Sequence, residues 1–338
     1  MTSTMEDVAR LAGVGRGTVS RVVNGQGSVS PATVARVKKA IAQLDFRPSH
    51  AGRVLTNGYS QLIGVYIPVP YGTFYTPILH TINTQLRAAG LQMMVAFGVD
   101  GGDMRRQAIE GLDFLSARGC DGLIAMTNQL HEEDLAGLGV MYGRLVVLND
   151  RFDCISEQCF TVDHMEGGRI AARALLELKH RQFAIIGGPS SSADNRERIA
   201  GFKDELEQAG IATATLWVAE TDFSSEGGFA AASKLLQSGY PFTALFCAND
   251  ETAAGALSCL QEAGIAIPAA VSVLGYDDTE TASYLAPPLT SVHVPWPEVT
   301  VSCVNQLINL CYGTHHRVQR EFPLSITHRA SLAEARGT

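Results

Sequence analysis

The sequence predicts a small all-α helix-turn-helix head at the N-terminus and an α/β body of two lobes, each lobe a doubly wound parallel sheet. Three short helix patterns follow one another within residues 1–47, and from residue 61 onward short apolar runs alternate with amphipathic helix patterns. The charge divides at the same place. Residues 1–60 hold eight Lys/Arg against three Asp/Glu, and because the whole chain has 26 and 34, residues 61–338 hold 18 against 31. A cationic head on an anionic body indicates that the head meets a polyanion.

The head is predicted to contain three helices. The first begins after Thr4, whose hydroxyl can cap the helix while Asp7 reaches back to it. A second helix pattern covers residues 16–24, and a third opens with a capping serine, Ser30, followed by Pro31 at the first helical position. The apolar positions expected to face the core of the head are Val8, Leu11, Ala12, Val19, Val22, Val23, Val34, Val37, Ala40, Ile41 and Leu44.

In a helix-turn-helix, the second helix lies in the major groove and its N-terminal residues contact base edges. Arg16 and Arg21 could each grip guanine O6 and N7 with two donors, or could instead be solvated or touch phosphate only. Hydroxyl and amide side chains on this helix are better placed for phosphate or mixed contacts. The candidate DNA contacts in the head are Thr4, Arg16, Gly17, Thr18, Ser20, Arg21 and Asn24.

The head resembles one protein family in detail. MEDVARLAGVGRGTVSRVVNG, followed by VSPATVARVKKAIAQLDFRPS, is similar to the N-terminal domain of the LacI/GalR family of bacterial transcription regulators. The resemblance implies sequence-specific binding to double-stranded operator DNA. Gly15 stands where the family usually has a capping serine, and Gly17 where a longer base-reading side chain is common. The two glycines cost the helix about 1 kcal/mol each relative to alanine and leave base readout more dependent on Arg16.

Residues 48–60 are predicted to form a hinge and linker. The stretch 49–56 (SHAGRVLT) is too short for a helix that is stable alone, and the resemblance implies that it orders only on operator DNA. The family inserts a leucine from this element into the minor groove. The matching residue is Leu55, and Arg53 is a further candidate DNA contact; the alternative is that Leu55 packs on its own body. Gly52 replaces the usual alanine and should make the hinge costlier to order.

The body is predicted from eight short apolar strands with helices between them. Such a pattern indicates buried parallel sheets with helices on both faces. Eight strand–helix units are more than a single open sheet usually contains, so two lobes fit better. The predicted strands are 62–67, 91–97, 122–125, 145–149, 183–186, 215–218, 244–247 and 271–274, and the predicted helices are 78–89, 105–118, 167–178, 196–209, 229–237 and 252–263.

The body also resembles the periplasmic-binding-protein-like core of the same family. That resemblance implies that the chain crosses between the lobes three times, near residues 161, 290 and 323. The effector-binding and dimerisation core is then 61–338. Its N-lobe is expected at about 61–160 plus 291–322, and its C-lobe at about 161–290 plus 323–338.

Ligands in open α/β sheets bind at the carboxyl ends of the strands, so a ligand site is expected between the lobes. Polar and aromatic residues follow several predicted strands, a mixture that suits the hydroxyl rim and apolar face of a sugar. The resemblance implies that Arg198, Asn249 and Asp277 contact the hydroxyl groups of the effector. It also implies that Phe223 stacks on the effector and that Phe74 and Tyr75 line the site from the other lobe. The alternative for Asn249 and Asp277 is that each only caps the helix after it.

The expected function is a homodimeric transcription repressor whose operator affinity is set by a small carbohydrate between the lobes. The runner-up is a regulator that responds to a non-sugar metabolite as corepressor. A transport binding protein would need a secretory signal, which the N-terminus does not show, and no basic head. A sugar-modifying enzyme would need a catalytic constellation, and the chain has no GxSxG, HExxH or GxxxxGK[ST] motif.

Composition points to a cytoplasmic protein without a membrane partner. No stretch approaches the roughly 20 apolar residues of a membrane helix. The seven cysteines are odd in number, scattered and without a CxxC pair, which is typical of reduced core cysteines. We therefore expect neither a metal nor another cofactor.

Overall fold

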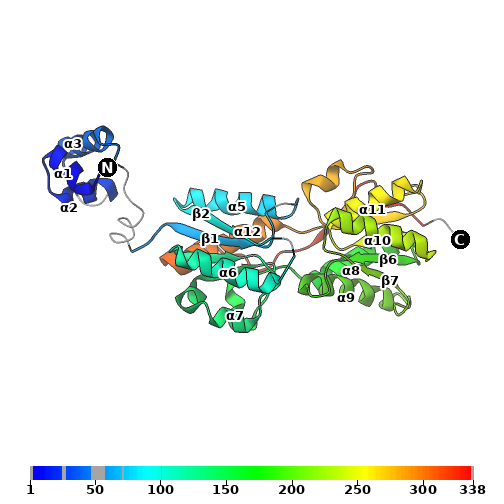
Figure 1. The fold of residues 1–338 in the computed structure, drawn as a ribbon. Helices are drawn as coiled ribbons and strands as arrows, with labels where there is room; N and C mark the ends of the chain where they lie inside the picture. Colours follow the sequence, from blue (N-terminus) through cyan, green and yellow to red (C-terminus); the bar gives the residue numbers. More distant parts are fainter. Residues whose placement is uncertain (1–2, 25–27, 47–57, 71, 100, 336–338) are drawn as a thin grey trace. The chain divides into compact units, whose positions relative to one another are not determined.

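The computed structural model describes residues 3–24, 28–46, 58–70, 72–99 and 101–335. Contacts within the chain divide it into two compact units, Met1–Ser60 and Gln61–Thr338, which we call the head and the body (Figure 1). The hinge contacts expected at Arg53 and Leu55 lie outside the described residues. Within the described ranges, no helix has both the length and the apolar character needed to cross a membrane.

The head contains α1 (Met5–Ala12), α2 (Arg16–Asn24) and α3 (Pro31–Gln43). The predicted capping box is present at α1, because Thr4 Oγ1 accepts from the Asp7 amide at 3.2 Å and Asp7 Oδ2 accepts from the Thr4 amide at 3.0 Å. The buried apolar residues of the head are Val8, Ala9, Ala12, Val19, Val37, Ala40 and Phe46.

One residue of the predicted head core was wrong. Leu11 is 51% exposed, whereas Ala9 is buried. The reason is that α1 packs against both α2 and α3, so its buried stripe runs through Met5, Val8, Ala9 and Ala12, at the i, i+3, i+4, i+7 spacing. Leu11 falls outside that stripe.

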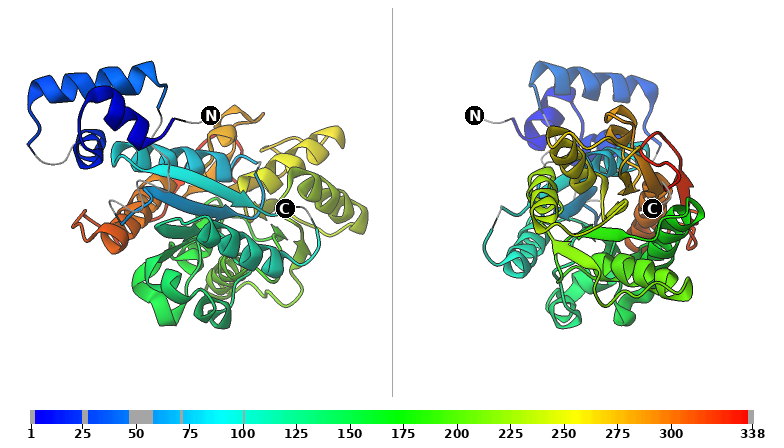
Figure 2. Two further views of the ribbon diagram at one scale, coloured as in Figure 1. Left: turned by 60° about the vertical axis from the view of Figure 1, so that its left-hand side comes forward. Right: turned by 90° about the vertical axis from the view of Figure 1, so that its right-hand side faces the viewer.

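The N-lobe is built on a parallel five-stranded sheet in the order β2-β1-β3-β4-β5. Two helices pack together on one face of this sheet, α5 and α12, while α6 covers the other face (Figures 1 and 2). Alternate residues of β1 serve the two faces, since Ile63 and Val65 belong to the α5/α12 core and Tyr66 to the α6 core. The bounds are β1 (Leu62–Ile67), β2 (Gln92–Phe97), β3 (Gly122–Ala125), β4 (Leu145–Leu148), β5 (Cys159–Phe160), α5 (Tyr75–Ala88), α6 (Met104–Ala117), α7 (Glu132–Ala136) and α12 (Trp296–Tyr312).

The C-lobe holds a six-stranded sheet in the order β11-β10-β9-β8-β6-β7, parallel except for the edge strand β11. One of its faces packs against α8 and α9, and the other against α10 and α11 (Figure 2). The bounds are β6 (Phe183–Gly187), β7 (Trp217–Glu220), β8 (Ala244–Cys247), β9 (Ser272–Asp277), β10 (Thr290–His293), β11 (Ser325–Thr327), α8 (His164–Glu177), α9 (Ala193–Gln208), α10 (Ser225–Ser238) and α11 (Asp250–Glu262).

The eight predicted strands all correspond to strands of the structure, with ends that differ by a few residues, and three short strands were missed. β5 and β11 have only two and three residues, and β10 reads TSVH, with one apolar residue among four, so none of them gives an apolar run that stands out from its surroundings. Ser291 pairs with Gly275 and His293 with Asp277, so β10 lies wholly in the C-lobe sheet. The crossing expected near residue 290 therefore comes after His293.

Glycines bring two helix pairs of the C-lobe into backbone contact. A Cβ atom at Gly168 on α8 would lie 2.0 Å from the Arg198 carbonyl oxygen on α9, and one at Gly201 would lie 1.9 Å from the Met165 carbonyl oxygen. The pair α10 and α11 meets in the same way at Gly228 and Gly255. These close approaches fix how α9 lies on α8 and how α11 lies on α10, and both α9 and α11 carry residues near the candidate site.

Gly168→Ala is expected to destabilise the body by about 1–3 kcal/mol, because the added methyl group meets main-chain atoms that cannot turn away. Thermal denaturation of the full chain should show a lower midpoint. Gly143→Ala is the matched control, since a Cβ there meets no atom within 4 Å. Equal midpoints for the two variants would contradict the close-packed interface.

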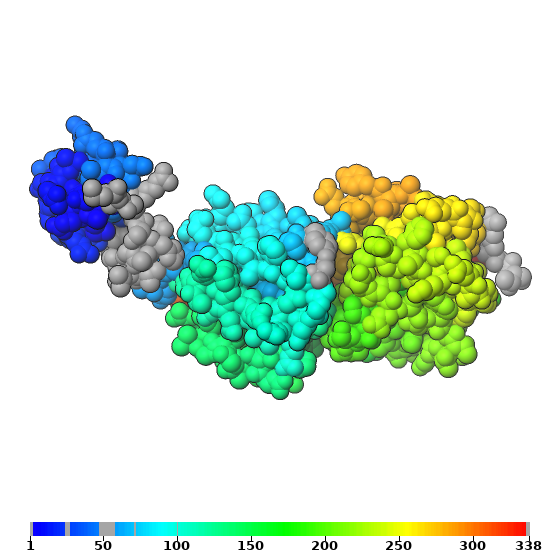
Figure 3. All heavy atoms as spheres, in the orientation of Figure 1, coloured from blue at the N-terminus to red at the C-terminus, as the bar shows by residue number. Residues whose placement is uncertain are grey.

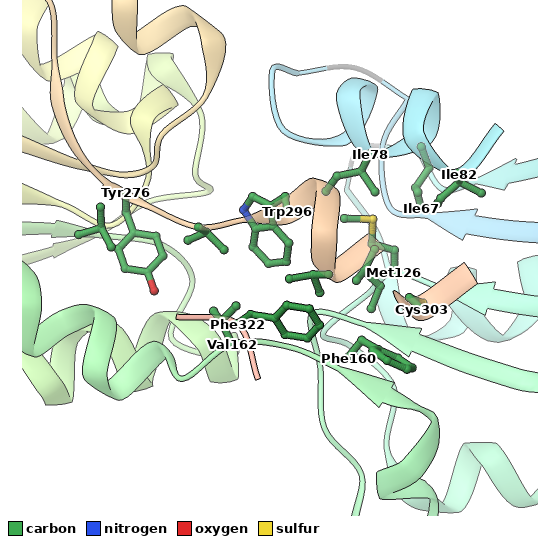
Figure 4. Close-up of a cluster of buried hydrophobic side chains, with 14 of the residues drawn as sticks. Ile67, Ile78, Ile82, Met126, Phe160, Val162, Tyr276, Trp296, Cys303 and Phe322 are labelled. Atoms are coloured by element: carbon green, nitrogen blue, oxygen red, sulfur yellow. The ribbon is translucent and has the colours of Figure 1, made fainter. Parts of the chain in front are cut away.

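One hydrophobic cluster continues from the N-lobe into the C-lobe. It includes Phe160 of β5, Trp296 at the start of α12 and Tyr276 of β9 (Figure 4). The two lobes also meet directly at the surface (Figure 3). Side chains from both sheets are therefore held at the lobe junction by a shared core.

Candidate functional site

The exposed side of α2 carries the predicted base-reading residues. Arg16, Gly17 and Arg21 are exposed, while Val19 is fully buried against the rest of the head. The Arg21 side chain lies along the first turn of its helix: Nε donates to the Gly17 carbonyl oxygen at 3.2 Å, and Nη2 to Thr18 Oγ1 at 3.4 Å. The structure thus brings Gly17, Thr18 and Arg21 together on one accessible surface.

The side chains of Ser20 and Thr4 are less available than those of Gly17 and Arg21. Ser20 is half-buried on α2, and Asn24 ends that helix, with its side chain outside the description. Thr4 Oγ1 donates to Asp7 Oδ2 at 2.6 Å, so its hydroxyl belongs to the cap of α1. Cβ atoms at Gly15 and Gly17 would meet nothing within 4 Å, which leaves open space in front of α2.

In the body, the predicted Arg198 and Asp277 lie together at the lobe junction. Arg198 on α9 is 2% exposed, and Asp277, the last residue of β9, is 5% exposed. Arg198 Nη2 lies 3.0 Å from Asp194 Oδ2 and 3.9 Å from Asp277 Oδ1, and the guanidinium carbon sits 4.1 Å from the centroid of the Tyr276 ring. The arginine is therefore held by two carboxylates and one aromatic face.

Asn249 and Asp277 differ in whether they cap a helix. Asn249 is the N-cap of α11, because its Oδ1 accepts from the Thr252 amide at 2.9 Å, and its Nδ2 also donates to the Phe223 carbonyl oxygen at 3.0 Å. Asp277 caps no helix. Its carboxylate accepts from Trp296 Nε1 at 3.2 Å, and the short helix that follows is preceded by Thr279.

Phe223 packs its ring against a glycine. A Cβ at Gly188 would lie 2.1 Å from the ring of Phe223, so only glycine leaves room for the aromatic at this place. Phe223 has a φ of +67°, and Asp277 has a φ of +96°, both in the region that L-residues seldom occupy. Seven described non-glycine residues have such backbone, and two of them are predicted site residues.

The N-lobe contributes Phe74 and Tyr75 at the start of α5. The Phe74 ring meets the rings of Tyr75 and Trp296 edge to face, each at 5.1 Å between centroids. Burial raises the pKa of the Tyr75 phenol, and Asp194 and Glu251 of the C-lobe raise it further. Figure 4 shows Trp296 between the two lobes. All six predicted effector residues thus lie at or near the lobe junction.

Sequence reasoning missed a polar ring that joins the lobes through Arg198. Asn149 follows β4 in the N-lobe, and its Nδ2 donates to Asp194 Oδ2 at 3.2 Å. His164 Nε2 donates to Asn149 Oδ1 at 2.9 Å, and Arg198 Nε donates to His164 Nδ1 at 3.3 Å. Burial, then the Arg198 charge, lowers the pKa of His164 to about 3, so the imidazole stays neutral and can accept. Each of the three added residues stands alone in the sequence, and no local pattern marks them.

A second contact between the lobes was also missed, and we call it the Thr73–Glu251 clasp. Thr73 lies in the loop before α5, and its hydroxyl donates to Glu251 Oε1 of α11 at 2.7 Å. The Thr73 main-chain amide donates to the same oxygen. Because Phe74 and Tyr75 follow Thr73 directly, the clasp sets where the N-lobe aromatics meet the C-lobe.

Thr73→Val is expected to loosen this clasp, because it removes the hydroxyl donor while the main-chain donor stays. The cost should be about 1 kcal/mol, with faster hydrogen exchange in residues 72–75 and in the first turn of α11. Thr81→Val is the control, since that hydroxyl bonds only within α5, to the Pro77 carbonyl oxygen. Unchanged exchange at both segments would contradict the clasp.

The pKa values of the buried acids of this site are shifted in opposite directions. Burial raises the pKa of Asp277 to about 6, although Arg198 and Trp296 partly offset it. Burial would also raise the pKa of Asp194, but Arg198 and other neighbours lower it to about 2. Asp250 behaves like Asp277: burial, with the Asp277 charge, raises its pKa to about 7. Among the described residues, no group of three or more His, Cys, Asp or Glu side chains is arranged to hold a metal ion.

Comparisons with known proteins match both units of the chain. The model of bacterial regulatory proteins of the lacI family matches residues 4–49, and the model of the periplasmic binding protein-like domain matches residues 172–332.

Three solved structures are similar over most of their length. A transcriptional regulator of the LacI family from Burkholderia phymatum is 46% identical, with 81% of this chain and 99% of that chain covered and a TM-score of 0.78. The lac repressor dimer bound to operator and the anti-inducer ONPF is 29% identical, with 98% and 100% covered and a TM-score of 0.86. The cellobiose complex of the transcriptional regulator CelR is 30% identical, with 97% and 99% covered and a TM-score of 0.70.

Proposed function

The chain belongs to the lacI family of bacterial regulatory proteins, and on that premise we propose that it represses genes for sugar uptake or catabolism under the control of a small carbohydrate. In this proposal it acts as a homodimer in the cytoplasm. Two heads bind the halves of a near-palindromic operator, and the carbohydrate binds between the lobes of the body.

The DNA side of the proposal is supported by the exposed surface of α2. Arg16 and Arg21 are its two cationic side chains, and the second helix of a helix-turn-helix presents such residues to base edges. Thr18 and Ser20 would set register through phosphate contacts, together with Asn24 and, from the other end of the head, Thr4. In the hinge, Leu55 would insert into the minor groove, and Arg53 would be a further DNA contact.

The effector side is supported by the chemistry gathered around Arg198. Asp277 and Asn249 offer fixed acceptors and donors, while Phe223, Phe74 and Tyr75 offer apolar faces. Hydroxyl groups need both kinds of partner, and the C–H face of a sugar ring packs on aromatic rings. CelR, a relative of this chain, is known as a complex with cellobiose, which is consistent with a carbohydrate at this place.

The coupling between the two sites is supported by the polar ring and the Thr73–Glu251 clasp. Both join the N-lobe to the C-lobe through residues at the effector site. A ligand that favours one arrangement of the lobes shifts the equilibrium only by its difference in affinity for the two arrangements. The change would reach the head through the N-lobe, since β1 follows the linker directly.

The test has two stages and uses the full chain. Selection from random duplexes, followed by a gel shift with unspecific competitor, should yield a near-palindromic site bound at least about a thousandfold more tightly than random DNA. A panel of neutral sugars is then added to the complex, and one of them should change the affinity. The absence of any preferred duplex would overturn the regulator, whereas a preferred duplex without a responsive sugar would overturn only the carbohydrate.

A further inference from the structure

The charges buried around Arg198 are unbalanced toward the negative. Asp194 and Asp277 both face this arginine, and Glu251 lies close enough to affect the pKa values of Asp277 and Tyr75. His164 contributes no positive charge, because its pKa is lowered to about 3. One buried cation thus faces two buried carboxylates, and the half-buried carboxylate of Glu251 lies nearby.

The two further cations near this cluster do not restore the balance. Arg151 and Arg196 are exposed, so solvent screens their charges: both lower the pKa of Glu197, Arg196 also lowers that of Asp150, and Arg151 makes a small contribution at His164. Asp150 still has a pKa raised to about 6, through burial first and then through Asp194 and Glu197. The edge of the site is therefore acidic as well.

The guanidinium group of Arg198 is already committed to the protein on all three of its nitrogens. Nε donates to His164 Nδ1 at 3.3 Å, Nη1 to the Ala248 carbonyl oxygen at 2.6 Å and Nη2 to Asp194 Oδ2 at 3.0 Å. An arginine clamps a phosphate or carboxylate with two parallel N–H groups. Three of its five N–H groups are therefore used within the protein. A fork through Nε and Nη2 would break the bonds to His164 and Asp194, which is costly for buried groups, and Nη2 also lies 3.9 Å from Asp277 Oδ1.

The helix ends at this place are also taken by the protein's own acids. Asp194 lies in the first turn of α9 and accepts from the Asn195 amide at 2.9 Å. Asp250 and Glu251 form the first turn of α11. Helix N-termini attract anionic ligand groups, and a carboxylate within the first turn cancels that attraction.

We infer that the effector of this site carries no anionic group: it is an uncharged polyhydroxylated molecule, or one bearing an amine, and phosphorylated and carboxylated sugars are rejected. This inference rests on the proposed function. A neutral hydroxyl donates to Asp277 or Glu251 without adding charge, and an ammonium group pairs with them. A phosphate instead adds up to two negative charges beside carboxylates in a medium where repulsion is poorly screened.

The first arm of the test needs no knowledge of the effector. Inorganic phosphate is titrated into the full chain, with sodium chloride of equal ionic strength as reference, and the thermal midpoint is followed. The Arg16→Ala/Arg21→Ala double variant is used beside the wild type, so that phosphate bound by the head is recognised. We expect no saturable stabilisation in the double variant, and saturable stabilisation there would overturn the inference.

The second arm compares molecules built on one ring, such as glucose, glucosamine, glucose 6-phosphate and glucuronate, with corresponding sets for other sugars. The tightest ligand should be neutral or amine-bearing, and its phosphorylated and carboxylated counterparts should bind at least about tenfold more weakly. An anionic member that binds as tightly as its neutral counterpart would overturn the inference while supporting a sugar effector. If no member of any set binds, the proposed function fails, and the inference with it.

A charge-removing variant tests the cause of the discrimination. Glu251→Gln keeps the shape of the side chain and one acceptor oxygen for the clasp. It should lower the ratio of the affinity for the neutral sugar to the affinity for its anionic counterpart. Glu226→Gln, an exposed substitution on α10, should leave that ratio unchanged. Equal ratios in the wild type and in Glu251→Gln would show that the carboxylate is not the source of the rejection.

Discussion

Arg21→Ala is expected to weaken specific operator binding strongly while the head remains folded. The side chain is exposed and touches only Gly17 and Thr18 of its own helix in the described structure, so its loss opens no cavity. A bidentate contact to guanine contributes about 1–3 kcal/mol per site, and a dimer loses it twice. The expected loss is therefore about 30-fold or more in affinity for the selected duplex. Gel-shift titration against that duplex and against random DNA measures it.

Arg36→Ala is the matched control for this prediction. Arg36 is also an exposed arginine of the head, but it lies on α3, where its Nη2 donates to Thr33 Oγ1 at 3.5 Å. Removing its charge should weaken binding to all duplexes by a similar small factor, as expected for the electrostatic part of the interaction. If Arg21→Ala weakened specific and random duplexes equally, Arg21 would be a phosphate contact and the base-reading role would be lost.

The sequence predicted an element of the fold correctly where the pattern for that element was long enough. The capping box at Thr4, the proline start of α3 and the long apolar strands gave patterns of four or more residues, and these elements lie where they were expected. Leu11 was assigned to the wrong side of α1, because α1 packs against two helices and the direction of its buried stripe depends on both. Strand β5, with two residues, is below the length at which periodicity carries information.

The candidate effector site shows the same limit more strongly. Strand ends pointed to Asp277 and Asn249, since parallel strands end at one edge of a sheet. No local rule could indicate that Asn149 and His164 close a ring with Arg198, because that ring depends on how the two lobes meet. No sequence pattern singled out Glu251, and its partner Thr73 lies far away in the sequence, in the other lobe. Contacts of this kind become visible only in three dimensions.

Asp277→Asn is expected to remove the effector response while leaving operator binding intact, and to stabilise the body at neutral pH. The asparagine amide oxygen can still accept the hydrogen bond from Trp296 Nε1. The amide carries no charge to pair with Arg198, and it offers ligand hydroxyls one acceptor oxygen in place of two. Loss of a charged hydrogen-bond partner costs about 1.5–3 kcal/mol in binding, so the sugar that alters operator affinity should bind at least about tenfold more weakly. Calorimetric titration with that sugar, together with a gel shift without it, separates the two activities.

The stability effect has a sign that can be worked out from the pKa of Asp277. Burial raises that pKa from 3.8 in the unfolded chain to about 6, so the folded state holds the proton more tightly. Stability from this group is fully present below pH 3.8 and is lost as the pH rises through 6; the loss approaches about 3 kcal/mol at pH 8. Asparagine does not titrate, so the variant should unfold at a higher temperature than the wild type at pH 8, by a margin that shrinks toward pH 5. Asp113→Asn, an exposed substitution on α6, should show no such pH-dependent margin. If the variant were instead less stable than the wild type at pH 8, the ion pair with Arg198 would outweigh the cost of burying the charge. The ionised Asp277 would then stabilise the fold, and its presence in the site would not reduce stability.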